Sequence, residues 1–376
     1  MFPLVGKLAC SNLSTKCIER VVIRFINISS NKGNIPLVSA IAENKTASFE
    51  DVTKEKEIEV HTCGKLYEKW RKERKFWTVP TSDHTFNIKY IDTGHHGKES
   101  CKATVVSLHG SPGSYKEFDP ITSHLYKKGV RVIAPNFPDA VPFPADNVVQ
   151  PTKFRHTPEE KAQLIRDFLQ ALRVSRVDLI LCHSSALFPG LHLSLDNKEV
   201  AVNSLALVNP TGLEIPRLLK PLWITKPMVK MCEFPMGYKI SQAIGKRIAN
   251  KPELKGGSLD KHFLSAYTLL HSSIPKQEVL FRALLNQNFP ILLAFSHNDK
   301  LISKRTSYKM AEIMVDAKDV LIYDKNGNAH GSGGENPFRK VMAFEKGSHF
   351  LTRTYPDIIS ESISSFLSQQ LENRAK

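Results

Sequence analysis

From residue 84 onward, short apolar runs alternate with longer helical stretches, and this pattern constrains the fold more than any other feature. Five runs have the length and apolar content of buried strands: 104–110, 130–135, 177–182, 204–210 and 289–295. A helical stretch between two of them opens with Thr157 and Pro158, residues that favour a helix N-cap and first helical position. Strands that alternate with helices predict a mostly parallel sheet covered by helices on both faces.

The strand runs at 204–210 and 289–295 are separated by roughly eighty residues, far more than a loop of a compact domain contains. Residues 211–288 are rich in Leu, Ile, Met and Lys, which is typical of helices. We therefore expect a helical cap at 211–288, inserted into an α/β core formed by 84–210 and 289–376. An apolar substrate lining is expected on the cap from six side chains: Leu213, Trp223, Met228, Met231, Phe234 and Met236.

The first 83 residues differ from the rest in composition. Residues 1–50 form a basic extension: up to residue 42, Glu19 is the one acidic residue beside five Lys or Arg. Such a composition resembles a mitochondrial targeting segment, and an ordinary basic strand at 21–28 would explain it as well. Residues 51–83 are dense in charges of both signs and predict a solvated helical segment.

Charge and cysteine content limit the partners and the compartment. The chain has 52 Lys and Arg against 37 Asp and Glu, a net charge of +15, which favours anionic surroundings. We expect association with an anionic membrane surface through residues 1–76 and consider nucleic acid a poor candidate. Six cysteines without a CxxC pair argue against a disulfide scaffold or a zinc site, so an intracellular protein, cytoplasmic or mitochondrial, is expected. No apolar run is long enough to predict a membrane span.

A candidate nucleophile follows the strand run at 177–182. Residues 182–186 read Cys-His-Ser-Ser-Ala, and a helical stretch follows them. A serine on a strand-to-helix turn exposes its hydroxyl at the carboxyl edge of the sheet, which suits Ser184 for nucleophilic attack. Ser185 is the alternative nucleophile, and a plain turn with capping serines is the structural alternative.

Two further segments supply an acid and a base. Asp299 comes directly after a strand run, and His349 lies in a Gly-Ser-His-Phe sequence after another one. An aspartate that accepts the imidazole N–H would orient the histidine, which would take the proton from the serine. His330, within the glycine-rich insertion at 326–337, is the alternative base, on a poorer platform for preorganised chemistry.

Together with Ser-Leu-His-Gly-Ser-Pro-Gly at 107–113, these segments resemble the serine-hydrolase branch of the α/β-hydrolase fold superfamily, and within it an uncharacterised α/β-hydrolase-like family. The resemblance covers residues 84–376, and the order Ser, Asp, His is the order used by that fold. It implies a triad of Ser184, Asp299 and His349. It also implies an oxyanion hole formed by the backbone N–H groups of Ser111 and Ser185.

The implied activity is hydrolysis of an ester or related acyl bond of a small, apolar acyl substrate, through an acyl-enzyme and without cofactor or metal. Acyl transfer to another acceptor would use the same residues, whereas an aspartate-nucleophile hydrolase is disfavoured by the serine. Cys182 and Ala186 stand where the family has glycines. This departure keeps open a second hypothesis, a catalytically weak or inactive binding or scaffold protein with the same fold.

Overall fold

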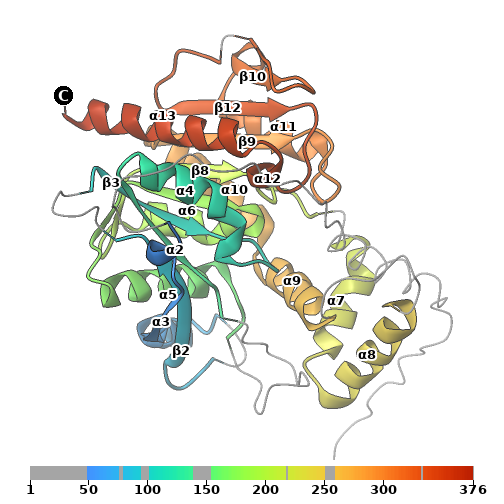
Figure 1. Ribbon diagram of the computed structural model, residues 1–376. Helices are drawn as coiled ribbons and strands as arrows, with labels where there is room; N and C mark the ends of the chain where they lie inside the picture. The colour runs from blue at the N-terminus through green and yellow to red at the C-terminus, as the bar shows by residue number, and fades with distance from the viewer. Residues whose placement is uncertain are drawn as a thin grey trace, which may run out of the picture.

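The computed structural model describes residues 49–75, 79–94, 101–138, 154–216, 219–249, 259–331 and 333–375. These residues form a mixed sheet of ten strands, in the order β1-β2-β4-β3-β6-β8-β9-β12-β10-β11 (Figure 1). The central strands are parallel: β4 (Val130–Pro135), β3 (Ala103–Leu108), β6 (Leu179–His183), β8 (Leu205–Val208), β9 (Ile291–Ser296), β12 (Arg339–Phe344) and β10 (Val320–Tyr323). Antiparallel strands flank them: β1 (Lys56–Thr62), β2 (His84–Asp92) and β11 (Ala329–His330). A separate short pair joins β5 (Arg176–Val177) to β7 (Ala201–Val202). The predicted mostly parallel sheet is confirmed.

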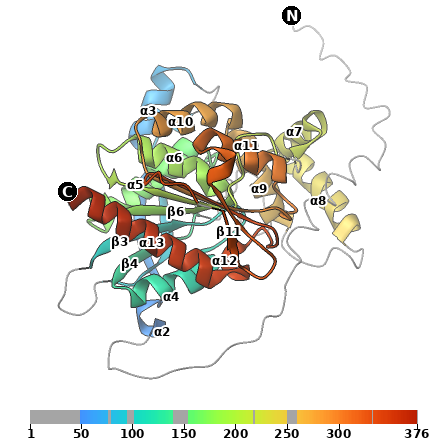
Figure 2. The ribbon, with the colours of Figure 1, turned by 90° about the horizontal axis from the view of Figure 1, so that it is seen from above.

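Helices cover both faces of the sheet, as predicted. One face packs against α4 (Asp119–Lys127) and α13 (Pro356–Ala375). The other packs against α5 (Pro158–Ala171), α6 (Leu187–Leu195), α10 (Ile274–Asn286) and α11 (Lys304–Met314). Figure 2 shows α4 and α13 on one side of the sheet, with α6, α10 and α11 on the other. Two apolar layers result because successive side chains of a strand point to opposite faces: in β9, Leu293 joins one layer and Leu292 the other.

Between β8 and β9, the described residues form α7 (Leu222–Met231), α8 (Pro235–Ala249), α9 (Leu259–His271) and α10. The α7 and α8 helices lie at the edge of the molecule and α9 lies between them and the core (Figures 1 and 2), whereas α10 packs against α6. These helices occupy the part of the chain where the cap is expected. No helix of the described ranges has the length and apolarity that a membrane crossing requires.

The prediction of a helical segment at 51–83 is wrong for its first half. Besides α2 (Phe49–Val52) and α3 (Gly64–Lys72), this part of the chain contains β1, which pairs with β2 along its whole length. In β1, the buried Val60 and Thr62 alternate with the exposed Glu59 and His61, the two-residue period of a half-buried strand. The α3 helix is not fully solvated either, because Tyr67 and Trp70 are buried in the core. The targeting prediction for residues 1–50 lies outside the described residues except for its last two positions.

The 326–337 insertion is only partly the loop that was expected. It contains β11, which pairs with β10 just before the insertion. The Asp324 carboxylate accepts the backbone N–H groups of Asn326 and Asn328 at 2.7 and 2.9 Å, which closes the turn between the two strands. Beyond β11, Gly333 and Gly334 have φ values of 72° and 69°. Glycine suits these positions because other residues rarely adopt positive φ.

Candidate active site

Ser184 lies on the turn that the sequence predicts for it. The β6 strand ends at His183, a 3₁₀ turn spans Ser184–Ala186, and α6 begins at Leu187. Ser184 has a φ of 55°, in the left-handed region that non-glycine residues seldom occupy and that is found at functional sites. Its carbonyl accepts the N–H of Thr211 at 3.1 Å, which ties the turn to the segment after β8.

Cys182 stands where the family has its first glycine, and a glycine elsewhere in the chain makes room for its side chain. A Cβ atom added to Gly190 of α6 would lie 2.5 Å from Cys182 Sγ. The thiol therefore occupies the space that a side chain at position 190 would need. A cysteine on the strand and a glycine on the helix allow the close approach of strand and helix that the family achieves with glycine on the strand.

The loop after β3 reaches Ser184 through Gly110. A Cβ on Gly110 would lie 2.8 Å from Ser184 Cβ and 3.3 Å from its hydroxyl oxygen. Because that clash would involve the inner atoms of the serine, position 110 requires glycine for this loop to reach the turn. The loop that was predicted to supply the oxyanion hole is thus adjacent to the candidate nucleophile.

Both predicted oxyanion residues are in this loop and turn, but one N–H group is already bonded. Ser111 N–H donates to the Ser185 hydroxyl at 3.0 Å, and Ser111 C=O accepts from the hydroxyl of Ser265 on α9 at 2.6 Å. A substrate oxygen that used Ser111 N–H would therefore have to displace the Ser185 hydroxyl.

His349 and Asp299 come together from separate segments of the chain. His349 Nδ1 lies 2.7 Å from one Asp299 oxygen, and the other oxygen accepts the N–H groups of Leu301 and Ile302 at 2.7 and 3.0 Å. Burial alone would raise the pKa of Asp299, but the imidazole and the two N–H groups outweigh burial and hold it below its ordinary value. Asp299 is thus a carboxylate fixed to accept a hydrogen bond from the imidazole N–H of His349.

His330, the alternative base, is exposed on β11, where its Nε2 lies 3.5 Å from Asp324. Of the two candidate histidines, His349 is therefore the one that is hydrogen bonded to Asp299.

Two residues that the sequence analysis did not single out hold the His349 loop. The Asn209 amide donates to Ser348 C=O at 2.8 Å and accepts the N–H of Ser296 at 3.0 Å. The Ser296 hydroxyl donates to Gly347 C=O at 2.8 Å. Asn209 directly follows β8, at the edge of the sheet where polar side chains converge. Its position after a strand could have indicated a role in the site.

A buried ion pair beneath the turn was also missed. His183 Nδ1 lies 2.7 Å from the Glu117 carboxylate, and His183 Nε2 donates to His349 C=O at 3.0 Å. Burial lowers the pKa of His183, but the Glu117 carboxylate outweighs burial and raises it overall, while His183 correspondingly lowers the pKa of Glu117. The charged imidazole ring thus donates from both nitrogens and fixes the backbone at His349.

The predicted apolar lining of the cap is wrong for four of its six residues. Leu213 and Met228 are buried, whereas the exposed fractions of Trp223, Met231, Phe234 and Met236 are 64%, 36%, 60% and 76%. The apolar pattern could not show which face of each helix points inward, because both faces of α7 carry apolar residues.

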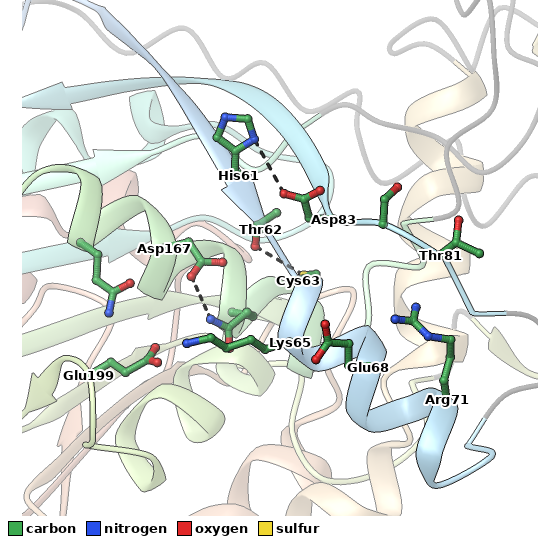
Figure 3. A pocket seen from close by; sticks show the side chains of 14 residues that line it. His61, Thr62, Cys63, Lys65, Glu68, Arg71, Thr81, Asp83, Asp167 and Glu199 are labelled. Carbon is green, nitrogen blue, oxygen red and sulfur yellow. Dashed lines mark hydrogen bonds and ion pairs between the residues drawn. The ribbon is translucent and has the colours of Figure 1, made fainter.

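A cavity of about 430 Å³ lies between α3 and α5, and Figure 3 shows its polar lining. His61 faces Asp83 at 3.8 Å, and Gln163 donates to Asp167 at 2.9 Å. Burial raises the pKa of the Cys63 thiol, so this lining residue is not a poised nucleophile. Within the described residues, no group of three or more His, Cys, Asp or Glu is suited to a metal ion.

Comparison with solved structures finds the same fold at low sequence identity. A protein of Mycobacterium tuberculosis is 13% identical, with a TM-score of 0.50, 76% of this chain covered and 94% of the other. An esterase from Exiguobacterium antarcticum is 14% identical, with a TM-score of 0.47 and coverage of 75% and 96%. A thermophilic esterase from Thermogutta terrifontis is 14% identical, with a TM-score of 0.48 and coverage of 84% and 99%.

No curated protein matches the chain. Residues 64–368 match a protein family described as alpha/beta hydrolase of unknown function (DUF1057). The match begins in α3, about twenty residues before the expected start at residue 84, and includes the cap helices. The chain therefore belongs to this family of α/β hydrolases.

Proposed function

We propose that this α/β hydrolase is a serine hydrolase that cleaves an ester or related acyl bond through an acyl-enzyme on Ser184. The observation that carries the proposal is the pairing of Asp299 with His349, in a loop that His183, the residue before Ser184, also binds. The rings of His183 and His349 are 4.8 Å apart between centroids, so the base lies next to the turn that presents the serine. Such a constellation is defined by geometry and by the role of each group.

In this mechanism, His349 removes the proton from the Ser184 hydroxyl while the serine oxygen attacks the acyl carbon. His349 then gives that proton to the leaving group. Water then attacks the acyl-enzyme with His349 again as base. The low pKa of Asp299 keeps it ionised, which stabilises the imidazolium that forms. The N–H groups of Ser111 and Ser185 would bind the oxyanion, and each such donor typically contributes about 2.7–4 kcal/mol.

Two cavities are lined by residues next to the triad, although Ser184, Asp299 and His349 do not line either of them. One, of about 320 Å³, is bordered by Thr211 and by Leu301 and Ile302, which follow Asp299. A smaller one is lined by the Gly110–Ser111 loop and by Leu264 of α9. The α9 helix also contacts the oxyanion loop through the Ser265 hydroxyl, so we propose that the cap helps to determine substrate preference.

The hydrogen bond from Ser111 N–H to the Ser185 hydroxyl favours a second candidate, a catalytically weak or inactive member of the family. A bonded donor stabilises an oxyanion only after the bond to Ser185 breaks. In this alternative the fold would serve binding, and Ser184 would stay unacylated.

Hydrolysis of p-nitrophenyl esters with acyl chains of increasing length tests the proposal. We expect turnover by the wild-type chain and a loss of a factor of about 10⁴ in Ser184→Ala, because the nucleophile is removed. Ser82→Ala, at an exposed serine of the polar cavity, is the matched control and should keep full activity. Equal rates in wild type and Ser184→Ala, or no turnover by folded wild type, would favour the second candidate.

A further inference from the structure

Helices α7 and α8 carry a group of exposed apolar side chains, here called the cap patch: Trp223, Met231, Phe234, Met236 and Ile240. Among the described residues, Val279 is the one other large apolar side chain that is exposed. Trp223 and Met231 lie eight residues apart on α7, and Met236 and Ile240 lie four apart on α8, so each pair shares one face of its helix. The patch therefore follows the outer faces of two consecutive helices.

The two helices join closely, which makes the patch continuous. A Cβ added to Gly237 would lie 2.4 Å from Met231 Cγ and 2.2 Å from its carbonyl oxygen. Met231 thus packs against the first turn of α8 and connects the apolar row of α7 with that of α8. Phe234 lies in the short connection between the helices.

The inner faces of these helices already supply their contacts with the protein. On α7, Ile224, Met228 and Val229 are buried, and Tyr238 of α8 is buried as well. An ordinary surface helix is apolar on one side only, so apolar residues on the second side require another explanation. Contiguous exposed apolar residues mark sites of contact with a protein or a membrane.

Exposed lysines accompany the apolar residues. Lys220, Lys226, Lys230 and Lys239 are exposed on the same segment, and its one acidic residue from 219 to 249 is Glu233. The segment is therefore apolar and cationic at once, in a chain whose net charge is +15. A second copy of the chain is a poor occupant, because a symmetric contact would bring the two sets of lysines together.

We propose that the cap patch docks on the surface of an anionic phospholipid bilayer. Trp223, Phe234 and Met236 would enter the head-group region, and the four lysines would contact the anionic head groups. Aromatic side chains favour the bilayer interface, and an amphipathic helix with lysines binds anionic lipid by the sum of apolar burial and charge. Figures 1 and 2 show α7 and α8 at the edge of the molecule, where a planar surface could reach them. This proposal does not depend on catalysis by Ser184, and it locates membrane contact on the cap instead of residues 1–76.

Vesicle sedimentation with the full chain tests the docking. The probes are vesicles of phosphatidylcholine with about 30% phosphatidylserine, and vesicles of phosphatidylcholine alone. We expect binding to the anionic vesicles that weakens with salt. The triple variant Trp223→Ser, Phe234→Ser, Met236→Ser should lose at least about tenfold in partition constant. The variant Lys226→Gln, Lys230→Gln should lose about fivefold for each lysine.

Matched controls separate the patch from general charge and apolarity. Val279→Ser removes an equally exposed apolar side chain from α10, and Lys318→Gln, Lys325→Gln removes two exposed lysines elsewhere. Both should bind like wild type. A blue shift of tryptophan emission with anionic vesicles should persist in Trp77→Phe and be lost in Trp223→Phe, while the third tryptophan, Trp70, is buried and cannot enter the lipid.

Several results would overturn the proposal. One is the absence of binding to anionic vesicles. Another is binding that the patch variants retain at wild-type strength, which would locate the contact elsewhere, including residues 1–76. A third is a dimer in light scattering that the triple serine variant converts to monomer, which would assign the patch to a second copy of the chain.

Discussion

The side chains beneath Ser184 fix the His349 loop from several directions. His183 binds the carbonyl of His349, and the Asn209 amide binds the carbonyl of Ser348. A base must be held within a few tenths of an ångström for proton transfer, and such supporting hydrogen bonds provide that precision. The His183 bond is buried and the Asn209 bond is partly buried, so losing either donor would leave a poorly solvated carbonyl unpaired as well as a mobile base.

One buried residue predicts how stability depends on pH. Lys161 is 4% exposed, and its Nζ lies 4.6 Å from the centre of the Phe137 ring. Burial lowers its pKa to about 7. The unfolded chain, with an ordinary lysine pKa near 10.4, therefore binds a proton that the folded chain lacks between about pH 7 and 10. Folding stability should rise with pH across this interval and be lowest below pH 7.

We expect Lys161→Met to raise the free energy of unfolding at pH 6 by about 2–4 kcal/mol, because it removes the buried ammonium while keeping the volume. It should also flatten the rise between pH 7 and 10. Urea denaturation at pH 6 and pH 9 measures both effects. Lys102→Met, at an exposed lysine, is the control. The same rise with pH in Lys161→Met as in wild type would show that Lys161 is not its source.

At the scale of elements, the contact between β6 and α6 explains how the chain tolerates a cysteine before the serine turn. The contact is complementary: the thiol of Cys182 fills the space above Gly190. A side chain at 190 would push the helix away from the strand and shift the turn that presents Ser184.

Gly190→Ala should therefore lower the free energy of unfolding by about 1–3 kcal/mol, as overpacked cores do. Alanine is otherwise favoured over glycine within a helix by about 1 kcal/mol, so the contact with Cys182 decides the sign. Adding Cys182→Ala should recover much of the loss, since it removes the sulfur that the new methyl meets. Urea denaturation of the two single variants and the double variant measures this coupling. Additive effects of the two substitutions would contradict it.

At the scale of the whole molecule, the sheet and its helices could be predicted from the sequence. The parallel strands are short apolar runs, and the apolar residues of the helices recur with the helical period of 3.6 residues. The positions of Ser184, Asp299 and His349 after three such strands were predictable for the same reason. The β1 strand was missed because its charged residues suggested a helix, although they alternate with Val60 and Thr62.

Other features depend on contacts between distant parts of the chain. The pairing of Cys182 with Gly190, and of His183 with Glu117, joins residues whose neighbours in the sequence give no sign of the contact. The direction in which Trp223 and Phe234 point depends on how the cap helices pack. The apolar composition of the cap therefore suggested a substrate lining, whereas these side chains lie on an exposed surface.

The site of reaction with a fluorophosphonate, which modifies an activated serine, tests whether Ser184 is the nucleophile. We expect one adduct per chain by intact mass, located by peptide mass spectrometry on Ser184 and abolished in Ser184→Ala. Asp299→Asn should slow the reaction strongly, because it removes the carboxylate that orients His349. A folded wild-type chain that stays unmodified, or an adduct on Ser185 in place of Ser184, would contradict the assignment of Ser184 as the nucleophile.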